Sequence, residues 1–307
     1  MQFIDLFCGI GGFRLALHKQ GHECIFSCDI DKKAQEIYKA NFHETPAGDI
    51  TSINTNKIPK HDILCAGFPC QSFSISGKHK GIHDPRGKLF YDIIRIAEKH
   101  KPIIMLLENV KNILTIDNNQ VIKTIQREIK NIGYDIHYHV SNSSLFGMPQ
   151  KRERVYFVCI KKGEDINYYE PKPTYKKKYL ENIIINNDDC KKLIINKRYE
   201  ITIDKTPKEN ELKPIRLGHI NKASQGERIY SIKGHSVTLA ATTGGAGANT
   251  GLYYINNQVR RLHIQECKKL MGFPENHKVS HGREGYKQLG NAVMPPMIEL
   301  IYKGIRL

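Results

Sequence analysis

The first 160 residues alternate short apolar runs with amphipathic segments, and this alternation constrains the fold more than any other feature of the chain. Ile122, Ile125 and Ile129, for example, follow helical spacing between two apolar runs. Strands that alternate with helices form mostly parallel sheets covered on both faces, which predicts a Rossmann-like α/β fold. The last two strands have no helical pattern between them and should pair antiparallel, which makes the sheet mixed. The predicted strands are Gln2–Phe7, Cys24–Cys28, Ile63–Ala66, Ile103–Leu107, Ile136–Val140 and Val155–Ile160.

The pattern changes near residue 170, where prolines and the run Lys176–Lys178 indicate a linker or an exposed loop. The following 80 or so residues contain strand-like fragments and glycines, which predict a second, smaller and β-rich domain. Helical spacing returns in Ile264–Met271 and again after Pro295-Pro296. The predicted division is a larger domain of residues 1–182 completed by 291–307, a β-rich domain of residues 183–262 and a hinge of residues 263–290.

Composition points to a polyanionic partner and argues against several other classes of protein. Lys and Arg number 47 against 31 Asp and Glu, and the formal charge of +16 suits nucleic acid, although a basic solvated surface would give the same count. No apolar run approaches the roughly 18 residues of a membrane helix, and the N-terminus lacks the features of a secretion signal. The eight cysteines include no C-x-x-C pair, which disfavours zinc, and we expect reduced thiols in a cytoplasmic protein.

A glycine-rich turn and an acidic turn follow the first two predicted strands. The first has the sequence DLFCGIGG, with glycines at a strand-to-helix junction where the backbone can approach a ligand. The second strand runs into Asp29 and Asp31, and a carboxylate at that place can accept hydrogen bonds from ribose hydroxyls. Together the two turns suggest an adenosine-containing cofactor. The alternative is a tight turn followed by an aspartate that only caps a helix.

Three further segments carry candidate catalytic groups. Cys70 follows an apolar strand and enters a loop of small polar residues, where a substrate could reach a nucleophile. Glu108 follows Ile103–Leu107, where partial desolvation favours general-acid chemistry. Arg152 and Arg154 precede the last strand, and alternation would point both to the same face. The corresponding alternatives are a buried thiol, a capping or surface glutamate and a solvated charge cluster.

Taken in order, the segments DLFCGIGG, GFPCQSFS, ENV, QKRER and GNAV resemble the motifs of the DNA (cytosine-5)-methyltransferases of bacterial restriction–modification systems. The resemblance covers nearly the whole chain. It implies an S-adenosylmethionine-dependent methyltransferase domain formed by residues 1–182 and 291–307, with residues 183–262 as a target recognition domain. It also implies a monomer that acts on double-stranded DNA without a metal. A restriction endonuclease for the same site is an expected partner, without a stable complex between the two.

The same resemblance implies a role for each candidate catalytic group. Cys70, as a thiolate, would attack C6 of the target cytosine so that C5 can accept the methyl group. Glu108 would hold and protonate N3 and accept from the exocyclic amine. Arg154 would contact O2, with Arg152 in support. This division of roles agrees with the physical requirement that charge developing on the ring must be stabilised.

Cofactor contacts are implied at both turns. Asp29 would bind the ribose. Ile30 and Ile50 would flank the adenine, and Asp49 would accept from the adenine amine. Ile30 replaces an aromatic residue of a similar methyltransferase, which we expect to weaken cofactor binding. Asn291, in GNAV, would close the methionine end. The other residues assigned to the cofactor are Phe7, Gly9, Gly11, Gly12, Pro69 and Leu89.

The target base lies inside a duplex and must therefore be flipped out before it can react. Ser76 and Gln225 would fill the space that the base leaves. Arg228 suits guanine and Glu227 suits a cytosine amine, which suggests a site of G and C only, such as GCGC. We expect the remaining positive charge to line a cleft between the two domains and to contact phosphates.

Three competing interpretations remain open from the sequence. An RNA cytosine-5 methyltransferase would share the catalytic domain, although the β-rich insert containing QGER favours DNA. A catalytically dead DNA-binding subunit is disfavoured by the joint presence of Cys70, Glu108 and Arg154. A nicotinamide-dependent dehydrogenase rests on the glycine turn alone and leaves the other motifs without an explanation.

Overall fold

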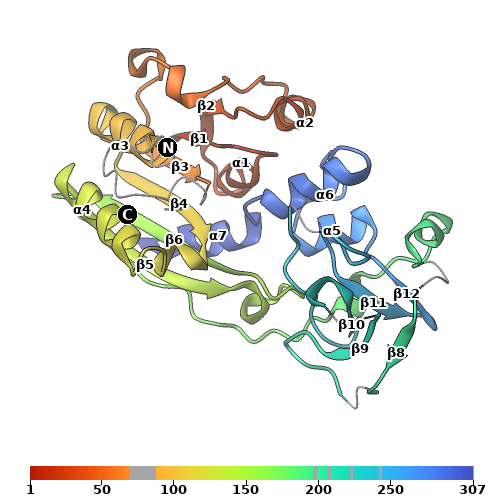
Figure 1. Ribbon diagram of the computed structural model, residues 1–307. Coiled ribbons are helices and arrows are strands. Elements are labelled where there is room, and N and C mark those ends of the chain that lie inside the picture. Colours follow the sequence, from red (N-terminus) through yellow and green to blue (C-terminus); the bar gives the residue numbers. More distant parts are fainter. Residues whose placement is uncertain (70–87, 196–198, 207–208, 222–223, 242–243, 307) are drawn as a thin grey trace. The chain divides into compact units, whose positions relative to one another are not determined.

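The computed structural model describes residues 1–69, 88–195, 199–206, 209–221, 224–241 and 244–306. The chain divides into two compact units, each with its own sheet (Figure 1). Unit 1 comprises Met1–Ser141, Glu153–Pro171 and Pro295–Leu307, and unit 2 comprises Asn142–Arg152 and Lys172–Met294. These bounds differ from the predicted division. Unit 2 includes the predicted hinge, the segment 142–152 and Asn291, because those residues make most of their contacts there.

A six-stranded mixed sheet forms the centre of unit 1, in the order β2-β1-β3-β4-β6-β5. β1 pairs in parallel with β2 and β3, β3 pairs in parallel with β4, and β6 runs antiparallel to β4. All six predicted strands are therefore present. Their bounds are β1 Gln2–Leu6, β2 Glu23–Cys28, β3 Ile63–Gly67, β4 Ile104–Val110, β5 Tyr134–Asn142 and β6 Glu153–Lys161. A short pair, β7 Asn167–Tyr168 and β13 Ile305–Arg306, lies apart from this sheet.

The predicted end of the fourth strand at Leu107 is wrong. β4 continues to Val110, and Glu108 lies opposite Tyr156 of β6 in an unbroken antiparallel register. The apolar run ends at Leu107, but the backbone groups of the next three residues still find partners on β6. Pairing with a neighbouring strand therefore extends the element beyond its hydrophobic part, and Glu108 belongs to the strand instead of following it.

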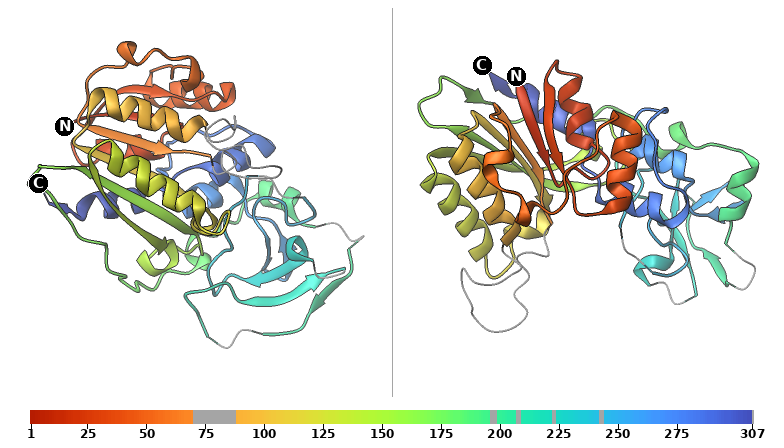
Figure 2. Two further views of the ribbon diagram at one scale, coloured as in Figure 1. Left: turned by 60° about the vertical axis from the view of Figure 1, so that its left-hand side comes forward. Right: turned by 90° about the horizontal axis from the view of Figure 1, so that it is seen from above.

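Helices cover both faces of the unit 1 sheet (Figure 2). α3 and α4 lie on one face, where Phe90, Ile93 and Ile125 join a core with Leu64 and Met105 of the strands. α1 and α7 pack against each other on the opposite face. The helices of unit 1 are α1 Gly12–His18, α2 Lys32–Phe42, α3 Lys88–His100, α4 Gln120–Asn131 and α7 Pro295–Lys303.

Unit 2 is built on a five-stranded sheet in the order β12-β11-β10-β9-β8. Its small core contains Ile220, Ile229, Leu252 and Val259, all of them buried. The strands are β8 Ile201–Ile203, β9 Arg216–Ile220, β10 Arg228–Ser231, β11 Leu252–Ile255 and β12 Gln258–Arg260, and the helices are α5 Ile264–Leu270 and α6 Gly282–Asn291. Among the described helices of the chain, none has both the length and the apolar character needed to cross a membrane.

Candidate active site

The turn between β1 and α1 has the backbone conformation that its glycines predict. Gly9 has a φ of +53° and Gly11 a φ of +88°, a left-handed region that favours glycine. A Cβ atom at Gly9 would meet nothing within 4 Å, so the backbone is open to a ligand there. A Cβ atom at Gly11 would instead collide with the ring of Phe42. Gly11 is thus required by packing, and Gly9 leaves room for a bound group.

Asp29 and Asp31, which both follow the second strand, have different roles in the structure. Asp31 caps α2, and its Oδ1 accepts from the backbone N–H groups of Lys33 at 3.0 Å and Ala34 at 3.4 Å. Asp29 instead accepts from the Gly9 N–H through Oδ2 at 2.7 Å. The carboxylate of Asp29 therefore borders the glycine turn, which is where a group that binds ribose would have to be.

The other residues assigned to a cofactor differ in exposure. The side chain of Ile30 is 69% exposed and is free to cover a planar ring, whereas Ile50 is only 3% exposed. Asp49 is partly buried and accepts from the Thr51 N–H at 3.0 Å. Leu89 packs against the core from the first turn of α3. Pro69 is exposed, and Phe7 is partly buried with a φ of +56°.

Glu108 and Arg154 form an ion pair across two neighbouring strands. The Nε atom of Arg154 on β6 lies 3.2 Å from Oε1 of Glu108 on β4, and the two side chains are 13% and 10% exposed. A second guanidinium nitrogen, Nη1, donates to the Glu153 carbonyl at 2.8 Å, which holds the arginine in place. The strands thus bring together two groups that are 46 positions apart in the sequence.

Asn109 is a site residue to which sequence reasoning gave no role. It is 2% exposed, and its Nδ2 donates to the Phe68 carbonyl at 2.8 Å. The asparagine therefore ties β4 to the residues immediately before Cys70. Its position next to Glu108 in the ENV motif was the one sequence feature that could have identified Asn109 as a site residue. Cys70 and Ser76 themselves lie outside the described residues, as does the side chain of Gln225.

Arg152 does not share a strand face with Arg154, so the predicted alternation is wrong. β6 begins at Glu153, and Arg152 belongs to unit 2. Its guanidinium is almost fully buried and donates to the carbonyls of Ala292 at 2.8 Å, Gly290 at 3.2 Å and Leu239 at 3.4 Å. Arg152 thus holds backbone segments of unit 2 together.

The two recognition candidates lie at the start of β10. Glu227 accepts from the Ser224 N–H at 3.0 Å and from Asn221 Nδ2 at 3.3 Å, so it stabilises its own turn. Arg228 is the first residue of the strand and is partly exposed. The Gly247 N–H donates to the Gly226 carbonyl at 3.1 Å. This contact fixes the QGER turn against the loop of the same unit that contains Gly244, Gly245 and Gly247.

Positive charge is concentrated in unit 2. That unit carries 24 Lys and Arg against 11 Asp and Glu, whereas unit 1 carries 23 against 20. Unit 2 therefore holds 13 of the 16 net positive charges. A polyanion would be attracted mainly to this unit.

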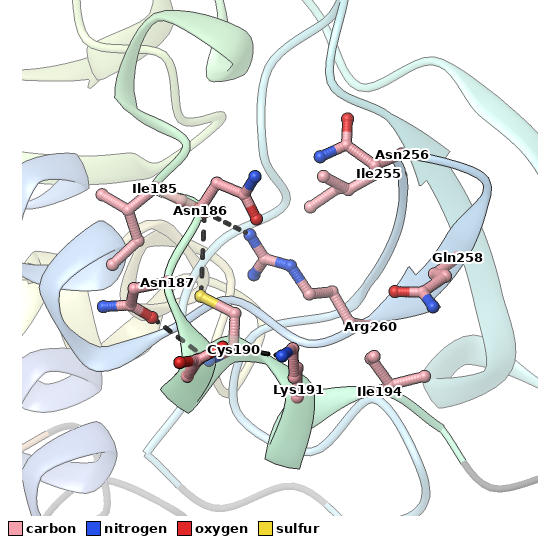
Figure 3. A pocket seen from close by; sticks show the side chains of 11 residues that line it. Ile185, Asn186, Asn187, Cys190, Lys191, Ile194, Ile255, Asn256, Gln258 and Arg260 are labelled. Atoms are coloured by element: carbon pink, nitrogen blue, oxygen red, sulfur yellow. Dashed lines mark hydrogen bonds and ion pairs between the residues drawn. The ribbon is translucent and has the colours of Figure 1, made fainter.

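Unit 2 also contains a cavity of about 440 Å³, lined largely by carboxamide and isoleucine side chains (Figure 3). Arg260 at its wall pairs with Glu266 at 2.7 Å and donates to the Ile185 carbonyl at 3.2 Å. These contacts commit the guanidinium to the fold, and we assign the cavity no catalytic role. In the described part of the chain, no three His, Cys, Asp or Glu side chains gather as metal ligands.

The chain shares its fold with solved structures of methyltransferases. The chain is similar to the S. pombe Dnmt2 methyltransferase, with a TM-score of 0.78, 18% identity and coverage of 98% of this chain and 97% of that one. It is also similar to the Entamoeba histolytica methyltransferase EhMeth, with a TM-score of 0.73, 20% identity and coverage of 99% and 98%. These similarities define an α/β S-adenosylmethionine-dependent methyltransferase fold.

Sequence comparison identifies the family. Residues 1–306 match the model of the C-5 cytosine-specific DNA methylases. The chain is 43% identical to the type II methyltransferase M.HhaI of Haemophilus parahaemolyticus, over 98% of this chain and 93% of the relative. It is 37% identical to M.NgoBI of Neisseria gonorrhoeae, over 98% and 91%. The protein therefore belongs to the C-5 cytosine-specific DNA methylase family and is a DNA (cytosine-5)-methyltransferase.

Proposed function

We propose that the protein methylates C5 of a flipped-out cytosine in a short duplex DNA site, through a covalent bond between Cys70 and C6. The observation that carries this proposal is the buried pair of Glu108 and Arg154. Asn109, the residue after Glu108 on β4, ties this strand to the residues that lead into Cys70. A carboxyl group and a guanidinium side by side match the N3 and O2 edge of cytosine.

Each group has a defined part in the reaction. The Cys70 thiolate adds to C6 while Glu108 protonates N3, so that negative charge does not accumulate on the ring. Arg154 donates to O2 and holds the base in plane. C5 then carries enamine character and takes the methyl group. A base then removes the C5 proton, the C6–S bond breaks to release the Cys70 thiolate, and N3 returns its proton to Glu108, which restores the double bond. Arg152 does not contact the base in this scheme and only positions backbone.

Membership of this family implies S-adenosylmethionine as methyl donor, which supplies an activated methyl group on sulfur. The residues around the glycine turn fit its adenosine half. The open space at Gly9 admits a ligand, and Asp29 at its border can accept from ribose hydroxyls. The exposed Ile30 can cover the adenine face, and Asp49 can accept from its amine. We further propose that Asn291 holds the methionine end.

We propose that unit 2 reads the DNA. Its concentrated charge suits phosphate binding, and Arg228 suits the O6 and N7 acceptors of guanine. Glu227 keeps acceptor capacity for a cytosine amine besides its hydrogen bonds with Ser224 and Asn221, because a carboxylate offers about four lone-pair sites. On the basis of Arg228 and Glu227, GCGC is the proposed site. Ser76 and Gln225 would fill the space that the flipped base leaves in the stack. We expect a monomer that modifies the site of a separately acting restriction endonuclease.

The test is direct. The protein is incubated with plasmid DNA and S-adenosylmethionine, and methylcytosines are mapped by conversion sequencing. 5-Methylcytosine at GCGC is expected, with none for Cys70→Ser and none on tRNA. Complete absence of 5-methylcytosine would overturn the proposed reaction. Methylation at another sequence would overturn only the proposed site.

A further inference from the structure

A polar network of buried side chains and the partly exposed Glu44 lies next to the glycine turn and joins residues that no motif singles out. Nη1 of Arg14 donates to Oε2 of Glu44 at 2.7 Å and to the Tyr38 hydroxyl at 3.2 Å. The Ser27 hydroxyl donates to the other carboxylate oxygen of Glu44, Oε1, at 2.6 Å. Arg14 is 8% exposed and Ser27 is 2% exposed. Both oxygens of one carboxylate are thus used to connect α1 with the end of β2.

The Glu44 end of this network holds the segment that leads to Asp49 in place against the end of β2. The Ala47 N–H donates to the Ser27 carbonyl at 2.8 Å, and the Asp29 N–H donates to the Ala47 carbonyl at 3.0 Å. Together with the bond between the Ser27 and Glu44 side chains, these contacts fix residues 44–49 in register with the end of β2. The backbone positions of Asp29 and Asp49 therefore depend on the same set of bonds.

The Arg14 end of the network supports the glycine turn. The guanidinium carbon of Arg14 lies 4.7 Å from the centre of the Phe42 ring and 5.3 Å from that of Tyr38. The Phe42 ring in turn occupies the space beside Gly11, and Gly9 donates to Asp29. The network therefore connects to the glycine turn, to Asp29 and to the segment that leads to Asp49.

We propose that Glu44, with Arg14 and Ser27, is a positioning device that sets the affinity for S-adenosylmethionine. This inference rests on the proposed cofactor site. Carboxylates that accept from ribose and adenine bind well only when they are held in place beforehand, because displacements near 1 Å lose much of the interaction. Since these groups hold the adenosine half, loosening them weakens cofactor binding and leaves the methyl-transfer step intact once the cofactor is bound.

The test compares Glu44→Gln and Ser27→Ala with the matched control Glu164→Gln. Glutamine at position 44 keeps one acceptor but turns an amide N–H towards the other donor. Glu164 also forms an ion pair in unit 1, with Lys161 at 2.6 Å, and its exposure of 31% matches the 34% of Glu44. The dissociation constant for S-adenosylhomocysteine is measured by titration calorimetry, and KM and kcat are measured with S-adenosylmethionine.

For Glu44→Gln we expect the dissociation constant and the cofactor KM to rise about tenfold, with kcat and DNA affinity within about twofold of wild type. Ser27→Ala should shift the same two constants in the same direction by a smaller factor, and it decides the question if Glu44→Gln does not fold. Wild-type cofactor affinity in folded variants, or an equal loss in Glu164→Gln, would overturn the inference. A wild-type protein that binds no cofactor would overturn the proposed function instead.

Discussion

The guanidinium of Arg152 donates to the Ala292 carbonyl at 2.8 Å, and so joins the QKRER motif to the GNAV motif within unit 2. The two arginines of QKRER therefore have separate tasks. Arg152 binds carbonyl oxygens of its own unit, and Arg154 faces Glu108. The difference can be measured by comparing stability with activity.

Arg152→Met should lower the free energy of unfolding by about 2–4 kcal/mol, because it leaves buried carbonyls without donors. Arg154→Met should cost less stability but reduce kcat by at least about a hundredfold, because a contact to the reacting base is lost. Thermal denaturation and single-turnover methylation of both variants check the contrast. Equal losses of stability in the two variants would contradict it.

Glu108→Gln should reduce kcat by about 10²–10³-fold while DNA and cofactor affinities stay near wild type. Glutamine is nearly isosteric and can still hydrogen-bond, but it cannot transfer a proton to N3. Rapid-quench methylation assays and DNA-binding titrations provide the two measurements. Glu153→Gln on the next strand is the control, since Glu153 pairs with Lys111 at 3.2 Å at a more exposed position. Wild-type kcat in Glu108→Gln would rule out the assigned role.

The contribution of Asp5 to the stability of the protein should fall as the pH rises from about 4 to 8. Burial raises the pKa of Asp5 from 3.8 to about 8, with Asp29 and Glu44 adding to the shift and Arg14 opposing it. The folded state then keeps a proton that the unfolded chain loses above pH 4, so each pH unit in this window costs up to about 1.4 kcal/mol.

Asp5→Asn removes this titration. Its melting temperature relative to wild type should therefore increase steadily between pH 5 and pH 8. Differential scanning calorimetry at several pH values gives the comparison, with the exposed Asp135→Asn as control. A difference between Asp5→Asn and wild type that does not change with pH would show that Asp5 is ionised in the folded state.

The salt dependence of DNA affinity should distinguish the residues of unit 2 that bind phosphates from those that recognise bases. Neutralising the exposed lysines 176–178 should lower DNA affinity for all sequences and reduce the slope of log K against log salt by up to about 3. Arg228→Lys should keep the slope but cost about 1–3 kcal/mol of discrimination at one base pair. Binding titrations at several salt concentrations, with GCGC and scrambled duplexes, make the comparison. A changed slope in Arg228→Lys would place that arginine among the phosphate contacts.

Sequence patterns predicted what depends on local periodicity. Six strands of unit 1 follow from their apolar runs, and the seven described cysteines are buried. The patterns failed where distant segments decide the structure. β4 extends past Leu107 because β6 pairs with it. Arg152 is not on the predicted face because β6 begins only at Glu153, the residue after it. The network of Arg14, Glu44 and Ser27 gave no signal, because no spacing rule connects three residues that meet only in the fold.

The boundary between the two units passes through the QKRER motif, between Arg152 and Glu153. Anyone who exchanges recognition units between relatives to create a new specificity must therefore choose the junctions with care. A graft of residues 172–294 alone would leave the host's own Gln150 and Arg152 facing foreign partners at Leu239, Met271 and Ala292. Moving residues 142–152 together with the graft preserves those contacts, so the exchangeable cassette is discontinuous in the gene although it is continuous in the folded protein.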